Sequence, residues 1–174
     1  MNKDITLLNF VNLQIQDKKR ILQWRNSDNI RKWMFNSNKI SVNEHFTFIN
    51  SLKSDSTKLY FLVKKNNDYL GIIDFTKITQ RSCYYGFYAN PDLKIQGIGR
   101  ILEKTCLDYA FNILEVEKLH LEVFKSNAQV KNLHRKNGFN ITSEKIVSGQ
   151  EVYCMELINT NFNKKQIQDT LWNQ

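Results

Sequence analysis

The sequence predicts a domain of the α+β class, with a mixed, mostly antiparallel sheet flanked by helices. Three runs rich in β-branched and aromatic residues, 59–64, 69–77 and 82–89, follow one another closely, and a turn-forming Asn-Asn-Asp segment joins the first two. Runs this close in sequence are expected to form an antiparallel meander. Apolar residues then recur at helical spacing from Ile98 to Ile113, which predicts an amphipathic helix on this sheet.

The N-terminal part is expected to add one strand and several short helices. Residues 5–14 have the composition of a first strand, and the apolar residues of 17–35 recur at the spacing of one or two helices. Ser41 and Glu44 form a capping box, in which each side chain satisfies a free amide at a helix start. A further helix is therefore expected to begin there.

The C-terminal part predicts a strand, a helix and a hairpin. Residues 118–124 form the strand, and residues 127–137 form a helix closed by Gly138, which can adopt positive φ. The segment 139–158 then reads as two strands that turn at Gly149 and the serine before it. We expect these elements to share the sheet with the meander.

Length and composition indicate one core. The 174 residues, 41% of them hydrophobic, suit a single domain over residues 1–160, followed by a tail, 161–174, that can contain a short helix. There is no apolar run of the roughly 20 residues that cross a bilayer and no signal peptide, so we expect a cytoplasmic protein without membrane attachment. The three cysteines are far apart and form no C-x-x-C pair, which favours reduced packing residues over disulfides or a metal site.

The net charge of +8 indicates an attraction for anionic partners. The basic residues are scattered in ones and twos, whereas a nucleic-acid binder usually gathers them into a stripe with exposed aromatics. We therefore expect no nucleic-acid partner. A basic nucleic-acid-binding module without catalysis remains the alternative of another class, and it would leave the glycine loop described next without a purpose.

Two glycines, Gly97 and Gly99, precede the long helix. Glycine lets a ligand approach the main chain, and the first amides of a helix have no intrahelical acceptor, so this terminus suits a phosphate or pyrophosphate, with Lys94 and Arg100 adding positive charge. The local sequence fits equally well a tight loop before a core helix. A dinucleotide-binding loop fits poorly, because it requires a third glycine where Leu102 stands.

Four segments, "YANPDLK", "IQGIGRIL", "LHLEVFKSN" and "LHRKNGF", together resemble the GCN5-related N-acetyltransferase (GNAT) family over most of the chain. Lys94 departs mildly from the family pattern, which begins with Gln or Arg. The resemblance implies the GNAT fold and acetyl-CoA as cosubstrate. It also implies a set of cofactor-binding residues along one strand, the loop and the next helix: Phe87, Tyr88, Ala89, Lys94, Gln96, Gly97, Ile98, Gly99, Arg100, Asn127 and Val130.

The N-terminal half is similar to the aminosugar N-acetyltransferases of the pseudaminic acid pathway, through "WRNSDNIRKWMFNSNKISVNEHFTFINSL" and "YFLVKKNNDYLGIIDFTKI". Those enzymes acetylate the 4-amino group of a UDP-linked 4,6-dideoxy-N-acetyl-altrosamine. The similarity implies a small-molecule UDP-amino-sugar substrate and a pocket of aromatic and polar residues: Arg25, Trp33, Met34, Phe35, His45, Phe48, Thr76, Lys77 and Tyr84. The epimer of the sugar, a homodimer, and an N-terminal protein acetyltransferase of the ribosomal-protein type are left open.

Acetyl transfer to an amine needs a neutral amine, a polarised carbonyl and a proton donor for the departing thiolate. In the resembling family the donor is usually a Tyr, and His134 stands in that place, so it is either the donor or a surface helix residue. Glu122 alternates with Leu121 and Val123 on its strand, so it faces the cleft as a base, acting directly or through water, or it faces solvent.

Overall fold

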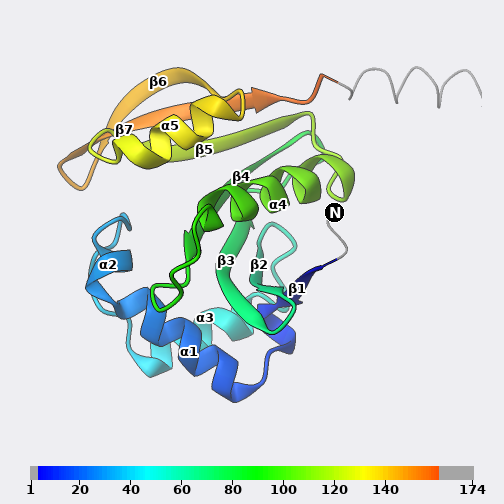
Figure 1. The fold of residues 1–174 in the computed structure, drawn as a ribbon, viewed down its shortest axis with the longest axis vertical. Helices are drawn as coiled ribbons and strands as arrows, with labels where there is room; N and C mark the ends of the chain where they lie inside the picture. The colour runs from blue at the N-terminus through cyan, green and yellow to red at the C-terminus, as the bar shows by residue number, and fades with distance from the viewer. Residues whose placement is uncertain (1–3, 161–174) are drawn as a thin grey trace, which may run out of the picture.

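The computed structural model describes residues 4–160. The tail expected over residues 161–174, and the short helix expected within it, lie outside the described residues. Within the described part the strands form one sheet in the order β1-β2-β3-β4-β5-β7-β6 (Figure 1). All neighbours are antiparallel except β4 and β5. The strands are β1 Ile5–Asn9, β2 Leu59–Lys65, β3 Asp68–Thr76, β4 Ser82–Ala89, β5 Lys118–Phe124, β6 Asn140–Val147 and β7 Gln150–Ile158.

Helices cover both faces of this sheet. Their bounds are η1 Phe10–Asn12, α1 Ile15–Asn26, α2 Asp28–Arg31, α3 Val42–Ser51, α4 Ile98–Asn112 and α5 Ala128–Lys136. One face is covered by α4, which lies along β3 and β4, while α5 overlies β5 and β7 (Figure 1). The other face of β2 and β3 is covered by η1, α1 and α3. The expected α+β architecture and the antiparallel meander are confirmed.

Each face has its own apolar cluster. Leu102 and Cys106 of α4 are fully buried against Phe75 and Leu119 of the sheet. Trp24 of α1 and Ile49 of α3 pack instead in the cluster that contains Leu62 and Ile72. The three cysteines are free, as expected, and Cys83 and Cys106 are buried.

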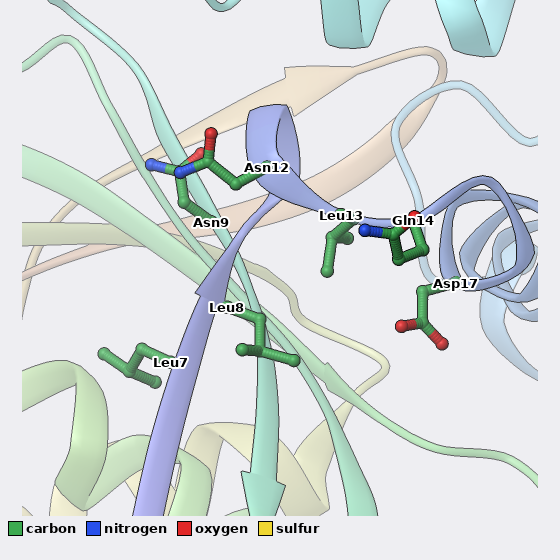
Figure 2. A pocket seen from close by; sticks show the side chains of 7 residues that line it. All are labelled: Leu7, Leu8, Asn9, Asn12, Leu13, Gln14 and Asp17. Carbon is green, nitrogen blue, oxygen red and sulfur yellow. The ribbon is translucent and has the colours of Figure 1, made fainter.

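Two details differ from the sequence prediction. The strand expected over 5–14 ends at Asn9, because the Asn9 side chain accepts a hydrogen bond from the Val11 amide and begins η1. At this edge a hollow of about 340 Å³ is lined by Leu7, Leu8, Asn9, Asn12, Leu13, Gln14 and Asp17 (Figure 2). It includes none of the predicted site residues. Ile113, expected on the buried helix face, is 60% exposed because α4 ends at Asn112 and Ile113 caps it.

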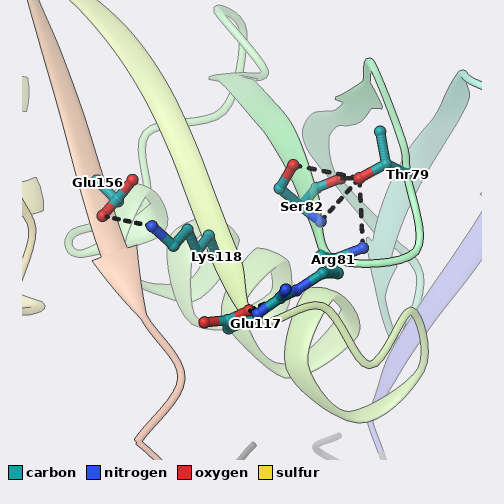
Figure 3. A network of polar contacts seen from close by, with 6 residues as sticks. All are labelled: Thr79, Arg81, Ser82, Glu117, Lys118 and Glu156. Atoms are coloured by element: carbon teal, nitrogen blue, oxygen red, sulfur yellow. Dashed lines mark hydrogen bonds and ion pairs between the residues drawn. The ribbon is translucent and has the colours of Figure 1, made fainter.

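The parallel strands β4 and β5 pair only at one end. Their register has three pairs, the last of which is Tyr84 with His120, and the remainder of β4 pairs with β3 alone. A polar network holds the paired end together, in which Arg81 Nε donates to Glu117 Oε2 at 2.8 Å (Figure 3). The Arg81 carbonyl also accepts from the Lys118 amide at 3.0 Å. The strands therefore separate toward the glycine loop.

No helix in residues 4–160 is long and apolar enough to cross a membrane. Within the same residues, no group of three or more His, Cys, Asp or Glu side chains is placed to hold a metal ion.

Candidate active site

The glycine loop presents unsatisfied backbone to the solvent. Gly97 caps α4 with φ of 81°, a left-handed conformation that favours glycine, and a Cβ built on it would have no atom within 4 Å. In the described structure the amides of Gln96, Gly97 and Gly99 make no hydrogen bond, whereas the Arg100 amide bonds to the Gly97 carbonyl at 3.0 Å. Of the five amides from Gln96 to Arg100, these three are thus available as donors to a pyrophosphate.

Side chains around the loop add positive charge and fix its position. Lys94, Gln96 and Arg100 are exposed. The turn before the loop is tied to α1, since Trp24 Nε1 donates to Asp92 Oδ2 at 3.0 Å, and to β3, since Asn90 Nδ2 donates to the Tyr69 carbonyl at 2.8 Å. The loop is consequently anchored to α1 and to β3.

The remaining predicted cofactor residues flank the opening between β4 and β5. Phe87 and Ala89 lie in the part of β4 that has no pairing with β5. Asn127 caps α5 by accepting from the Val130 amide at 3.3 Å. Tyr88 belongs to this stretch of β4, but its side chain packs with the α1 and α3 cluster on the opposite face.

His134 is not a surface helix residue. It is 4% exposed, and its Nδ1 lies 2.6 Å from Oε1 of Glu103, a side chain of α4 that is completely buried. The Tyr85 hydroxyl donates to the same oxygen at 3.0 Å, and Asn137 Nδ2 donates to Oε2 at 2.6 Å. Both carboxylate oxygens of Glu103 are therefore hydrogen-bonded.

The face opposite α4 has polar side chains from three strands. The Tyr84 ring stacks on His120 with centroids 5.0 Å apart, and Lys77 Nζ lies 4.3 Å from the Tyr84 ring centre. Thr76 pairs with Tyr84 across the strands. Glu122 shares this face, where Lys145 Nζ lies 2.7 Å from its Oε2, and the carboxylate raises the pKa of Lys145.

Arg25 reaches this face from α1. Its Nη2 donates to the Asn36 carbonyl at 2.6 Å, while Nη1 is buried without a hydrogen-bond partner, the one such side-chain nitrogen or oxygen in residues 4–160. Burial lowers the pKa of Arg25, and the nearby Tyr88 hydroxyl opposes that effect. A buried guanidinium nitrogen with no acceptor is costly, so it is a donor suited to a ligand oxygen.

The aromatic segment after α2 lies over β5. Trp33 and Phe35 are about 40% exposed, while Met34 is partly buried. The Phe35 ring meets Phe124 of β5 edge-on at 5.2 Å. This segment therefore flanks the same face as Glu122, with aromatic area open to a ligand.

Two predicted pocket residues have structural partners. His45 is 5% exposed and its Nε2 lies 2.8 Å from the Lys18 carbonyl, which joins α3 to α1, and burial lowers its pKa. Phe48 meets Tyr60 edge-on at 5.0 Å inside the α1 and α3 cluster. Ligand contact by these two residues stays a prediction.

The sequence reasoning missed two carboxylates. Glu103 lies three residues before Cys106 and seven before Ala110, a spacing that places it on the buried face of α4. Asp74 stands between the fully buried Ile73 and Phe75 of a central strand, and strand alternation places its side chain on the face opposite α4. In each case the signal was an ionisable residue at a position whose neighbours are core.

Burial raises the pKa of Asp74 to about 7. Its carboxylate lies opposite Gly86, where a Cβ would come within 3.0 Å of Oδ2. A larger residue at Gly86 would therefore displace this carboxylate, so glycine there makes room for it.

Comparison with known proteins agrees with this arrangement. The pattern of the Acetyltransferase (GNAT) family matches residues 19–139. The chain belongs to this family. "Acetyltransferase PseH" of Campylobacter jejuni subsp. jejuni serotype O:2 is 43% identical over 140 residues, which are 80% of this chain and 87% of that relative. The expected enzyme class, N-acetyltransferase, and its cosubstrate, acetyl-CoA, are thereby confirmed.

Solved structures show the same GNAT fold. The crystal structure of C. jejuni N-acetyltransferase PseH in complex with acetyl coenzyme A aligns with a TM-score of 0.74 at 36% identity, covering 90% of this chain and 99% of that one. A Vibrio cholerae spermidine N-acetyltransferase in complex with CoA and spermine aligns with a TM-score of 0.81 at 24% identity, covering 93% and 99%. The second likeness concerns the fold alone.

Proposed function

We propose that this GNAT protein transfers the acetyl group of acetyl-CoA to the 4-amino group of a UDP-linked 4-amino-4,6-dideoxy-N-acetyl-hexosamine. The specific substrate is UDP-4-amino-4,6-dideoxy-N-acetyl-β-L-altrosamine, in pseudaminic acid biosynthesis in the cytoplasm. The observation that carries the proposal is the 43% identity to PseH over 80% of the chain. Transfer proceeds by direct attack in a ternary complex.

The residues of the loop side fit acetyl-CoA. The free amides of Gln96, Gly97 and Gly99 suit its pyrophosphate, because they lie at the N-terminus of α4, where the helix dipole favours an anion. The separated part of β4, at Phe87 and Ala89, offers unpaired backbone to the pantetheine arm. Acetyl-CoA supplies an acetyl group activated as a thioester.

The residues of the opposite face fit a nucleotide sugar. The unpartnered Nη1 of Arg25 and the ammonium of Lys77 suit diphosphate oxygens. The exposed rings of Trp33 and Phe35 suit the flat uracil and the apolar side of a 6-deoxy sugar.

The acid and base lie on different elements. His134, from α5, holds the proton that the departing sulfur takes up. Glu122, from β5, accepts the amine proton directly or through one water, using Oε1, because Lys145 occupies Oε2.

An exposed edge strand such as β6, with Ile141 and Ile146 uncovered, is available for a homodimer.

The test is CoA release by the purified protein with single acceptors. We expect turnover with the UDP-linked 4-amino sugar, less with its gluco epimer, and none with peptides. Turnover of peptide N-termini with no response to any amino sugar would contradict the proposal and support the N-terminal protein acetyltransferase.

A further inference from the structure

Glu103 has no part in the chemistry described so far, although it is a completely buried carboxylate in contact with the proposed acid. We propose that Glu103 is a positioning residue that fixes the orientation and tautomer of His134, so that Nε2 is the nitrogen that serves the departing sulfur. This inference rests on the role proposed for His134.

The hydrogen bonds around Glu103 determine which nitrogen carries the fixed proton. Burial raises the pKa of Tyr85 well above its usual range, so its hydroxyl keeps its single proton, which it donates to Glu103 Oε1. An ionised carboxylate only accepts. Nδ1 of His134, 2.6 Å from the same oxygen, must therefore be the protonated donor. Nε2 is therefore the nitrogen that can give or take a proton during the reaction.

Nε2 is the open side of the imidazole. No hydrogen bond of the described residues uses it, yet it is not among the buried atoms that lack a partner, so it reaches accessible space. The ring stands next to Phe87, with centroids 6.0 Å apart, in the stretch where β4 has left β5. The neighbouring Leu133 lies 3.4 Å from a Cβ built on Gly99 of the cofactor loop.

Stability alone gives no reason for a carboxylate in this place. A buried charge is costly unless it is fully paired, and apolar residues of similar volume usually replace buried ion pairs without loss of stability. The titratable groups that face the Glu103 and His134 pair are Tyr85 from β4 and Cys106 from α4. Neither adds a second charge, because burial raises the pKa of both.

The transfer moves one acetyl group from sulfur to nitrogen and one proton to sulfur. His134 Nε2 gives its proton to the sulfur while the carbon–sulfur bond breaks and the amine nitrogen forms the new carbon–nitrogen bond. The electron pair of the broken bond stays on sulfur, and the base removes the extra proton of the new amide nitrogen. Glu103 stabilises the positive charge that His134 holds before the step.

The experiment is a double-mutant cycle on kcat with Glu103→Gln and His134→Phe. We expect His134→Phe to lower kcat about 100-fold with little change in the KM for acetyl-CoA. Glu103→Gln should lower kcat at least about tenfold in the wild-type background and cause no further loss beside His134→Phe. In Glu103→Gln the pH–kcat limb that depends on His134 should move to lower pH, because the imidazolium has lost its carboxylate.

Thr105→Val is the matched control. Thr105 is a buried polar side chain of the same helix that bonds only to the Ile101 carbonyl, at 2.8 Å. We expect its kcat and pH profile to be those of the wild type. Equal losses from Glu103→Gln in both backgrounds, or an unmoved pH profile, would overturn the positioning role.

A second measurement needs no substitution at Glu103. The chain has three histidines, so ¹⁵N NMR of histidine-labelled protein with His134→Phe as the assignment reference resolves the tautomer of His134. We expect protonated Nδ1 and unprotonated Nε2 in the neutral ring, and the reverse tautomer would overturn the inference. If His134→Phe keeps wild-type kcat, the inference fails while amino-sugar acetylation stands. If no amino sugar is acetylated, the proposed function fails, whatever the tautomer.

Discussion

The two sides of the opening between β4 and β5 are built from different kinds of chemical group. The cofactor side uses backbone: free amides at Gly97 and its neighbours, and a helix start capped by Asn127. The acceptor side uses side chains that come from separate elements, including Arg25 of α1, Lys77 after β3 and Glu122 of β5. Backbone sites require only local glycine and capping signals, whereas the acceptor side exists only once the chain has folded.

The same contrast separates two carboxylates, Glu103 and Asp74. Glu103, on the cofactor side, has hydrogen-bond donors on both oxygens. Asp74, on the acceptor side, has a pKa raised to about 7 by burial, and a Cβ built on Gly86 would lie 3.0 Å from its Oδ2. The Glu103 carboxylate is fully hydrogen-bonded within the described part of the fold, and the Asp74 carboxylate is not. An incompletely bonded carboxylate is typical of a face that a substrate completes.

The largest expected effect comes from Gly97→Asp. The new side chain imposes strain at φ of 81° and brings negative charge to the amides proposed to bind the diphosphate, so acetyl-CoA affinity should fall by more than about 100-fold in calorimetry. Gly149→Asp is the matched control, because Gly149 has φ of 77° and the same open surroundings. Similar affinity losses in both variants would show that strain, and not the loop, is responsible.

The next effect concerns Asp74→Asn and stability. Asp74 ionises near pH 4 when unfolded and near pH 7 when folded, so between these values the folded state binds more protons and the residue destabilises the fold as pH rises. The penalty is complete above pH 7 and absent below pH 4. Asn cannot ionise, so we expect the variant to be about 4 kcal/mol more stable at pH 8 and nearly unchanged at pH 4.

Thermal melts at the two pH values measure this difference. A variant that is less stable than the wild type at pH 8 would contradict it, because Asp74 would then be a stabilising, partnered charge. The result sharpens the contrast with Glu103, whose carboxylate is already satisfied within the fold.

The smallest effect is expected from Arg25→Met. Loss of the unpartnered Nη1 should raise the KM for the amino-sugar nucleotide about tenfold and leave the KM for acetyl-CoA unchanged. Arg31→Met is the control, since Arg31 Nη1 also holds the segment after α2, through the Ser37 carbonyl at 3.1 Å. Equal KM changes in both variants would assign the effect to that segment and not to ligand contact.

The sequence predicted the elements and the loop because their signals are local. Glycines, the Ser41 capping box and apolar spacing act within a few residues, and the structure contains the elements they indicate. The bond between His134 and Glu103 joins residues 31 positions apart in different helices, and no local pattern specifies it. The unpartnered state of Arg25 Nη1 likewise depends on how α1 packs on the sheet.

The most direct test of the central claim is a competition in one vessel. The purified protein receives acetyl-CoA with equal amounts of the UDP-linked 4-amino-4,6-dideoxy sugar, an N-terminal peptide and spermidine, and mass spectrometry quantifies the acetylated products. The account predicts that the sugar nucleotide alone gains an acetyl group, on its 4-amino nitrogen. Acetylation of the peptide or of spermidine in preference to the sugar would contradict it.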